Sequence, residues 1–192
     1  MSFLIHKFKN NNTSKDYLYK LSVLFFQASP EYDILYKKFR FDKFKFFKEL
    51  FKNKNSEIKE LLIVEKNKKP IGFINGFASD QLKLRKIQSI LIFKNLIYPK
   101  NPSNFIKKKI KNLGEIDKSY YISKLSIEKK FRKKGLANKL LNKIYAKSKK
   151  NKFRFLSLHV QKSNKIAIKF YLRNNFFVSN SKYSYLYMKR KI

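Results

Sequence analysis

The alternation of apolar and polar positions predicts strands and helices that follow one another along the chain. Residues 3–8 form a short alternating strand, and the segment 15–28 has apolar side chains at helical spacing behind an N-cap at Thr13 or Ser14. A second apolar stripe predicts one further helix over about 33–53. We expect both apolar faces to pack into a core.

The pattern in the middle of the chain predicts a β-hairpin followed by an insert. Segments 60–66 and 70–79 are strand-like and are separated by Asn67, two lysines and Pro70. We expect Gly72 and Gly76 to mark a bulge or tight packing in the sheet. The pattern of residues 82–118 predicts two lysine-rich, partly helical pieces. They form either a cap over a binding site or a surface segment that takes no part in binding.

The last third has the most regular pattern. It predicts, in order, a strand at 120–127, a helix at 136–150, a strand at 153–160, a helix at 164–175 and a closing antiparallel pair at 176–178 and 183–190. The order β-α-α-β-β-insert-β-α-β-α-β-β indicates a mixed α/β (α+β) fold. We expect one domain over residues 1–192, with a variable insert at about 82–118.

Composition adds a large positive charge. The formal net charge is +35, from 47 Lys and Arg against 12 Asp and Glu. Such an excess usually indicates a nucleic-acid or membrane partner. However, the lysines are spread along the whole chain, and the abundant residue types share A/T-rich codons, which favours compositional drift. Two alternatives stay open: a basic nucleic-acid-binding or structural protein with a degenerate fold, and contact of residues 82–112 with anionic lipid.

Several kinds of site are excluded by residue counts. The chain has no cysteine and two distant histidines, His6 and His159, so we expect neither a disulfide nor a metal site. The N-terminus has no long apolar segment of a signal peptide, and the apolar run 87–98 is broken by Lys94 and is too short to span a bilayer. These features predict a cytoplasmic protein.

A loop with phosphate-binding features follows the strand at 120–127. It contains Arg132, Gly135 and Ala137 in an R-x-x-G-x-A pattern and leads directly into a helix. The N–H groups at a helix N-terminus have no partner within the helix, and the helix dipole adds about half a positive charge there. By itself this spacing also fits the start of an ordinary lysine-rich surface helix.

A second motif lies about thirty residues downstream, where Asn164, Ala167 and Tyr171 form N-x-x-A-x-x-x-Y ahead of Phe176. With both motifs in this order, residues 120–178 resemble the GNAT N-acetyltransferase superfamily. Asn175 replaces the family's usual glycine before the phenylalanine, but asparagine tolerates a left-handed backbone. The resemblance implies a central mixed, mostly antiparallel sheet flanked by helices. It also implies direct transfer of an acetyl (acyl) group from acetyl-CoA to a primary amine of a small-molecule or protein acceptor, in a ternary complex.

The resemblance also implies which residues hold coenzyme A. They lie on the strand end, the loop and the last helix: Leu125, Ser126, Ile127, Arg132, Lys133, Lys134, Gly135, Leu136, Ala137, Asn164, Ala167 and Tyr171. The pyrophosphate would sit on the N–H groups of residues 132–137, and the pantetheine arm would run along 125–127. An N–H near Ile127 would hold the oxyanion.

Two residues are candidates for proton transfer. The resemblance implies that Tyr171 is the general acid that protonates the thiolate, although it could also simply pack in the core. His159, on the strand face opposite Leu158 and Val160, is a candidate general base. A polar surface histidine, or an ordered water in the role of base, are the alternatives. Asn164 is expected to cap the last helix, to contact the coenzyme, or both.

Overall fold

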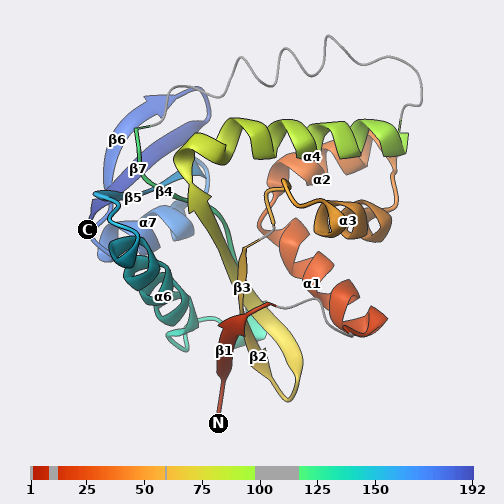
Figure 1. The fold of residues 1–192 in the computed structure, drawn as a ribbon, viewed down its shortest axis with the longest axis horizontal. Coiled ribbons are helices and arrows are strands. Elements are labelled where there is room, and N and C mark those ends of the chain that lie inside the picture. The colour runs from red at the N-terminus through yellow and green to blue at the C-terminus, as the bar shows by residue number, and fades with distance from the viewer. Residues whose placement is uncertain (1, 9–12, 59, 98–116) are drawn as a thin grey trace.

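The protein forms a seven-stranded sheet with helices on both faces (Figure 1). The computed structural model describes residues 2–8, 13–58, 60–97 and 117–192. The sheet order is β1-β2-β3-β4-β5-β7-β6, and every neighbouring pair of strands is antiparallel except β4–β5. The strands are β1 (Leu4–Lys7), β2 (Leu61–Lys66), β3 (Lys69–Ala78), β4 (Tyr120–Ile127), β5 (Phe155–Gln161), β6 (Phe177–Lys182) and β7 (Tyr185–Lys191). This arrangement confirms the predicted mixed, mostly antiparallel sheet.

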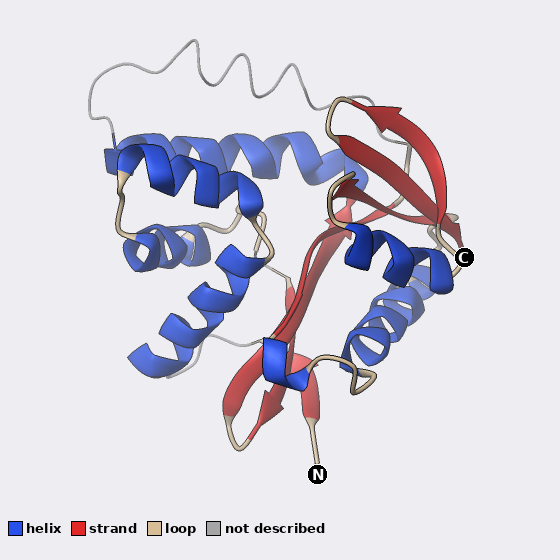
Figure 2. Ribbon diagram, turned by 180° about the vertical axis from the view of Figure 1, so that it is seen from behind, coloured by secondary structure: helices blue, strands red, loops and turns tan. Residues whose placement is uncertain are grey.

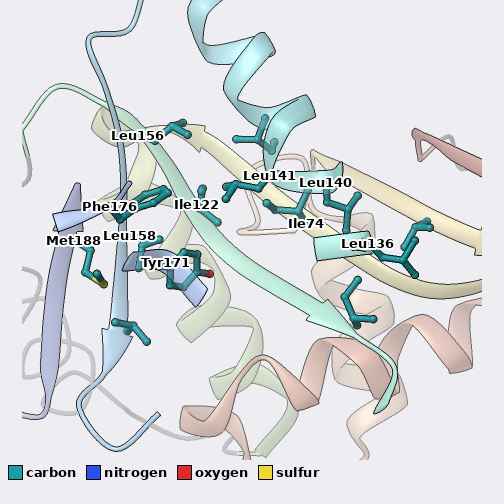
Figure 3. Packing of buried hydrophobic residues seen from close by; sticks show 14 of the residues in the cluster. Ile74, Ile122, Leu136, Leu140, Leu141, Leu156, Leu158, Tyr171, Phe176 and Met188 are labelled. Carbon is teal, nitrogen blue, oxygen red and sulfur yellow. The ribbon is translucent and has the colours of Figure 1, made fainter. Parts of the chain in front are cut away.

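The helices divide between the two faces of the sheet, as Figures 1 and 2 both show. They are α1 (Lys15–Gln27), α2 (Pro30–Phe39), α3 (Lys43–Lys52), α4 (Leu82–Ile97), α6 (Leu136–Lys150) and α7 (Lys165–Arg173). Helices α1 to α4 pack with one sheet face around a cluster rich in phenylalanine. Helices α6 and α7 pack on the other face, where Leu136, Leu140 and Leu141 are buried against the strands (Figure 3).

The first predicted helix is confirmed, but the second prediction is wrong. Ser14 caps α1 by accepting a hydrogen bond from the N–H of Tyr17 at 3.2 Å. The stretch 33–53, predicted as one helix, is two helices, α2 and α3. Helix α2 ends because Arg40 takes a left-handed conformation with φ 51°, and Asp42 then caps α3 through the N–H of Lys45. The apolar spacing continues across this break, which is why the pattern did not reveal it.

The β2–β3 hairpin is confirmed, with its turn at Asn67 and Lys68, which both have positive φ. Pro70 was predicted to separate the strands but lies within β3, opposite Glu65 and beside a register shift, a place in a sheet that proline tolerates. Gly72 and Gly76 pack tightly, as expected. A Cβ added at Gly72 would lie 2.5 Å from Cδ1 of Ile127, and one at Gly76 would lie 2.7 Å from the Tyr120 ring.

The first half of the predicted insert is α4, and it packs onto the helical side of the molecule. Its Phe93 is buried, with its ring 5.1 Å from that of Phe41 and 5.8 Å from that of Phe46. Phe93 therefore anchors α4 in the core on the helical side of the molecule. Residues 98–116 of the insert, which include all the rest of the lipid-contacting segment expected at 82–112, lie outside the described residues. Within the described ranges, no helix is long and apolar enough to cross a membrane.

Candidate active site

Strands β4 and β5 lie side by side only at their beginnings. They pair in parallel from Tyr120 opposite Leu156 to Ile122 opposite Leu158, and no further. At that point β4 has a bulge. Asn75 of β3 pairs with Lys124, and the next residue, Gly76, pairs with Ile122, so Ser123 of β4 is left as an extra residue without a partner in register. A bulge bends its strand. The rest of β4 therefore diverges from β5 and leaves a gap in the sheet.

A cleft of about 1590 Å³ follows this gap. It is lined by residues of α2, α4, β4, the loop before α6, β5, α7 and the β6–β7 hairpin. The cleft brings together all but one of the residues predicted for the site. The exception is Lys134, whose Nζ lies 5.7 Å from the centre of the Phe131 ring.

The loop before α6 presents a row of unpaired N–H groups. Gly135 takes a left-handed conformation, with φ 71°, and turns the chain into the helix. Within the described ranges, the N–H groups of residues 133–138 have no acceptor, whereas the N–H of Arg132 donates to the carbonyl of Lys129 at 3.3 Å. The unpaired row thus begins one residue later than predicted. Such a row at a helix N-terminus binds anions.

Main-chain groups of β4 face the gap. The N–H of Glu128 donates to the carbonyl of Ile71 on β3 at 2.8 Å. In an antiparallel pair the residues alternate between facing the partner and facing away, so the backbone groups of Leu125 and Ile127 face the gap. The Nε of Arg132 donates to the carbonyl of Ile127 at 3.0 Å, which ties the loop to the end of β4.

Helix α7 supplies a capping residue and a buried tyrosine. The side chain of Asn164 accepts a hydrogen bond from the N–H of Ala167 at 3.0 Å, which confirms the predicted N-cap. Tyr171 is buried beside Leu158, and in Figure 3 its hydroxyl points away from Phe176. Burial raises the pKa of Tyr171, so the hydroxyl keeps its proton. Asn175 has φ 61°, the left-handed conformation expected there.

The predicted base has a partner that the sequence did not reveal. Nδ1 of His159 lies 3.2 Å from the hydroxyl of Tyr121, on the neighbouring strand β4. The His159 ring opens to the cleft and lies 4.9 Å from the ring of Tyr187. Burial by these surroundings and, to a lesser degree, the charge of Lys86 lower the pKa of His159 to about 4. The imidazole is therefore neutral near pH 7. The alternating pattern of 120–127 carried a signal for Tyr121, because it places this side chain on the face opposite the α6 core.

A buried group of four charges was also missed by the sequence reasoning. Glu31 on α2, Glu57 before β2, Lys86 on α4 and Lys124 on β4 pair with one another, and all but Glu57 line the cleft. No pattern could have selected these two lysines in a chain so rich in lysine. Within the described part of the chain, no three or more His, Cys, Asp or Glu side chains group as a metal site would.

Solved structures with this arrangement of elements include acetyltransferases. The PaiA N-acetyltransferase from Thermoplasma acidophilum, in complex with coenzyme A, has a TM-score of 0.59 at 18% identity, with 100% of each chain covered. A GNAT family acetyltransferase from Elizabethkingia anophelis, with acetyl-CoA bound, has a TM-score of 0.55 at 10% identity, covering 99% of this chain and 98% of that one. At these identities the similarity establishes the fold.

The sequence itself identifies the family. Comparison with curated proteins gave no match. The model of the acetyltransferase (GNAT) family matches residues 25–176, which is most of the chain and includes both motifs and the diverging strands. The chain therefore belongs to the GNAT acetyltransferase family.

Proposed function

We propose that the protein transfers an acetyl group, or a related acyl group, from acetyl-CoA to a primary amine. The observation that carries this proposal is the gap between β4 and β5. One end of the gap meets the unpaired N–H groups of residues 133–138, and the other end meets the Tyr121–His159 pair. An anion-binding end joined to a proton-accepting end is what transfer from a phosphorylated carrier to an amine requires.

The residues present fit coenzyme A. Its pyrophosphate would bind to the N–H groups of residues 133–138, with the charges of Arg132 and Lys133 nearby. Gly135 leaves room there, since a Cβ at this position would meet nothing within 4 Å. The pantetheine arm would pair with the free backbone groups of Leu125, as an added strand would, while the carbonyl of Ile127 stays bonded to Arg132. Asn164 and Ala167 would border the arm from α7.

The same residues can carry the chemistry of direct transfer in a ternary complex. The amine nitrogen attacks the thioester carbonyl, a C–N bond forms and the C–S bond breaks. The N–H of Ile127 would stabilise the charge that develops on the carbonyl oxygen. His159, neutral and hydrogen-bonded to Tyr121, would accept the proton that the amine loses, and Tyr171 would donate a proton to the departing thiolate.

The relatives in the fold support this assignment. The Thermoplasma protein is described as an N-acetyltransferase in complex with coenzyme A, and the Elizabethkingia protein has acetyl-CoA bound. Nitrogen as the acceptor atom is the part of the proposal that the family alone does not fix, because the family match specifies only an acetyltransferase.

A screen of amine classes tests the proposal. The full chain is incubated with acetyl-CoA and with amino sugars, polyamines, amino acids, peptide N-termini or peptide lysines, and free thiol is measured. We expect thiol release above the hydrolysis background with at least one class, and a mass increase of that amine by one acetyl group. Thiol release that never depends on an added amine would contradict amine transfer.

A further inference from the structure

Three side chains that carry rings lie in a row across three neighbouring strands of the sheet. Tyr121 belongs to β4, His159 to β5 and Tyr187 to β7. His159 lies directly opposite Tyr187, and Tyr121 lies opposite Ser157, two residues before His159. Residues that are opposite each other, or two apart on one strand, share a face of the sheet. All three rings therefore lie on one face, away from the core that contains Leu158.

The imidazole of His159 is contacted from two sides. On one side Nδ1 lies 3.2 Å from the hydroxyl oxygen of Tyr121. On the other side the centre of the Tyr187 ring lies 4.9 Å from the centre of the imidazole, and the two planes are inclined by only 30°. Rings at such a distance and inclination attract each other face to face. The hydrogen bond thus fixes one atom of the imidazole, and the Tyr187 ring fixes its plane.

Tyr187 is itself held firmly in place. Its position on β7 is paired on both sides, with His159 on β5 and with Asn180 on β6. Its side chain is 8% exposed and lines the cleft. The hydroxyl oxygen is buried and has no hydrogen-bond partner among the described residues. The part of Tyr187 that acts on His159 is therefore the ring surface and not the hydroxyl.

The second nitrogen of the imidazole is the one left for a substrate. Nδ1 is engaged with Tyr121, whereas Nε2 has no hydrogen bond to any residue that the structure describes, and the ring lines the cleft. In a neutral imidazole one nitrogen carries the hydrogen and the other accepts, and the hydrogen bond of one decides the state of the other. For Nε2 to accept a proton, Nδ1 must carry the hydrogen and donate it to the hydroxyl oxygen of Tyr121.

We propose that Tyr187 is a positioning residue for the transfer: its ring holds the imidazole of His159 against Tyr121, so that Nδ1 stays bonded and Nε2 stays directed into the cleft. The role in catalysis rests on the proposed function. The proton that leaves the amine goes to Nε2, and the imidazole becomes an imidazolium with hydrogen on both nitrogens. Tyr187 lies outside the two sequence motifs, so the β6–β7 hairpin gains a part in the site.

The state of the imidazole tests this without substrate and without any change at Tyr187. Long-range proton–nitrogen NMR spectra of the full chain at pH 7 show which nitrogen carries the hydrogen, and a His6→Gln variant assigns the two histidines. We expect hydrogen on Nδ1 of His159, together with a nuclear Overhauser effect between the ring protons of His159 and Tyr187. Hydrogen on Nε2, or the absence of this ring-to-ring effect, would overturn the proposal.

Two variants of Tyr187 separate the ring from the hydroxyl. Tyr187→Leu removes the ring, whereas Tyr187→Phe keeps the ring and loses only a hydroxyl that has no partner among the described residues. In the leucine variant the imidazole should turn away from Tyr121 and show a mixture of both neutral forms. The phenylalanine variant should match the unchanged protein. A single Nδ1–H form in Tyr187→Leu, or an equal change in Tyr187→Phe, would overturn the proposal.

Tyr145→Leu is the control for a general loss of packing. Tyr145 is a half-buried tyrosine of α6 that packs on the other face of the sheet, with its ring 4.3 Å from the guanidinium carbon of Arg190. This variant should be less stable than the unchanged protein but should keep hydrogen on Nδ1 of His159. A mixture of forms there would show that loosened packing is sufficient, and would overturn the specific role of Tyr187.

Activity gives a second readout once an acceptor is found. Tyr187→Leu should lower kcat by about 10- to 100-fold, because a misplaced base reacts poorly, and should leave the KM for acetyl-CoA unchanged. Tyr187→Phe should keep the original kcat. A higher KM for acetyl-CoA with unchanged kcat, or an equal loss in both variants, would overturn the catalytic part. If the amine screen fails while the spectra behave as expected, the proposed function is wrong but the hold of Tyr187 on His159 stands.

Discussion

The hydroxyl oxygen of Tyr121 lies 3.2 Å from Nδ1 of His159, and this contact joins β4 to β5 at the point where the two strands part. Its position matters because the gap between the strands begins there. The thioester carbonyl of a coenzyme bound along the gap would lie close to the imidazole of His159. The Tyr121–His159 contact therefore links the shape of the sheet to the proton transfer that amine attack requires.

The low pKa of His159 predicts a pH dependence of stability. Its folded value of about 4 lies below the usual 6.5, so between these pH values the unfolded chain binds a proton that the folded chain does not. Stability should therefore fall as the pH drops from 7 to 5, and His159→Gln should lose less over this window. Urea unfolding at both pH values measures this. Equal losses of unfolding free energy in the unchanged protein and in His159→Gln would contradict a lowered pKa of His159.

Measurement between pH 7 and pH 5 separates the effect of His159 on stability from the effect of the buried Glu57 carboxylate. The lysines beside Glu57 outweigh its burial and lower its pKa to about 2, so its contribution to stability is present above pH 4.5 and is lost as the pH falls below that value. Unfolding measured from pH 4.5 to 2.5 should show a further loss that Glu57→Gln lacks.

Tyr171→Phe should slow transfer without weakening coenzyme binding. The ring is buried in the α7 core and phenylalanine fills the same space, so the unfolding temperature should change little. Loss of a general acid reduces the rate by about 100-fold or more. Steady-state kinetics and a calorimetric titration of acetyl-CoA on the same samples measure the two effects. Unchanged turnover would remove Tyr171 from the chemistry.

Gly135→Ala should weaken both the fold and coenzyme binding. The left-handed conformation at φ 71° costs a residue with a Cβ about 1–2 kcal/mol, although the Cβ itself meets nothing. Gly135→Asn is the matched control and should cost less, because asparagine tolerates this conformation. Chemical denaturation and acetyl-CoA titration of both variants test this, and an alanine variant as stable as the original would contradict the conformational argument.

Lys124→Met should destabilise the protein strongly. Its side chain is only 3% exposed, and its removal leaves Glu31 without its 2.6 Å partner, which for a broken buried pair costs about 3–5 kcal/mol. The control is Lys52→Met. Lys52 is 67% exposed in its pair with Glu49, so this change should cost less than about 1 kcal/mol. Similar costs for the two variants would show that burial does not govern these ion pairs.

The last third of the chain could be predicted from its sequence because local and global signals agree there. The helix starting at Leu136 has its glycine turn, its apolar face and its partner strands in continuous order, and the residues from Arg132 to Ala137 stay together when the chain folds. Asn164 and Tyr171 lie on one short helix, so their spacing alone places them at the same cleft.

The rest of the site depends on contacts between distant segments, which one sequence does not encode in a readable form. Tyr121 meets His159 only because β4 and β5 are neighbours, and Lys86 meets Glu57 only because α4 folds back over the sheet. The break between α2 and α3 was missed for a different reason. Arg40 takes a left-handed conformation that residue type alone does not suggest.

Calorimetric titration of the full chain with acetyl-CoA tests the central claim most directly, since every role proposed above requires the coenzyme in the gap between β4 and β5. We predict saturable binding of one coenzyme per chain, weakened by added salt because the pyrophosphate is held by N–H groups and lysine charges. The absence of both heat and any shift in unfolding temperature at millimolar acetyl-CoA would contradict the account.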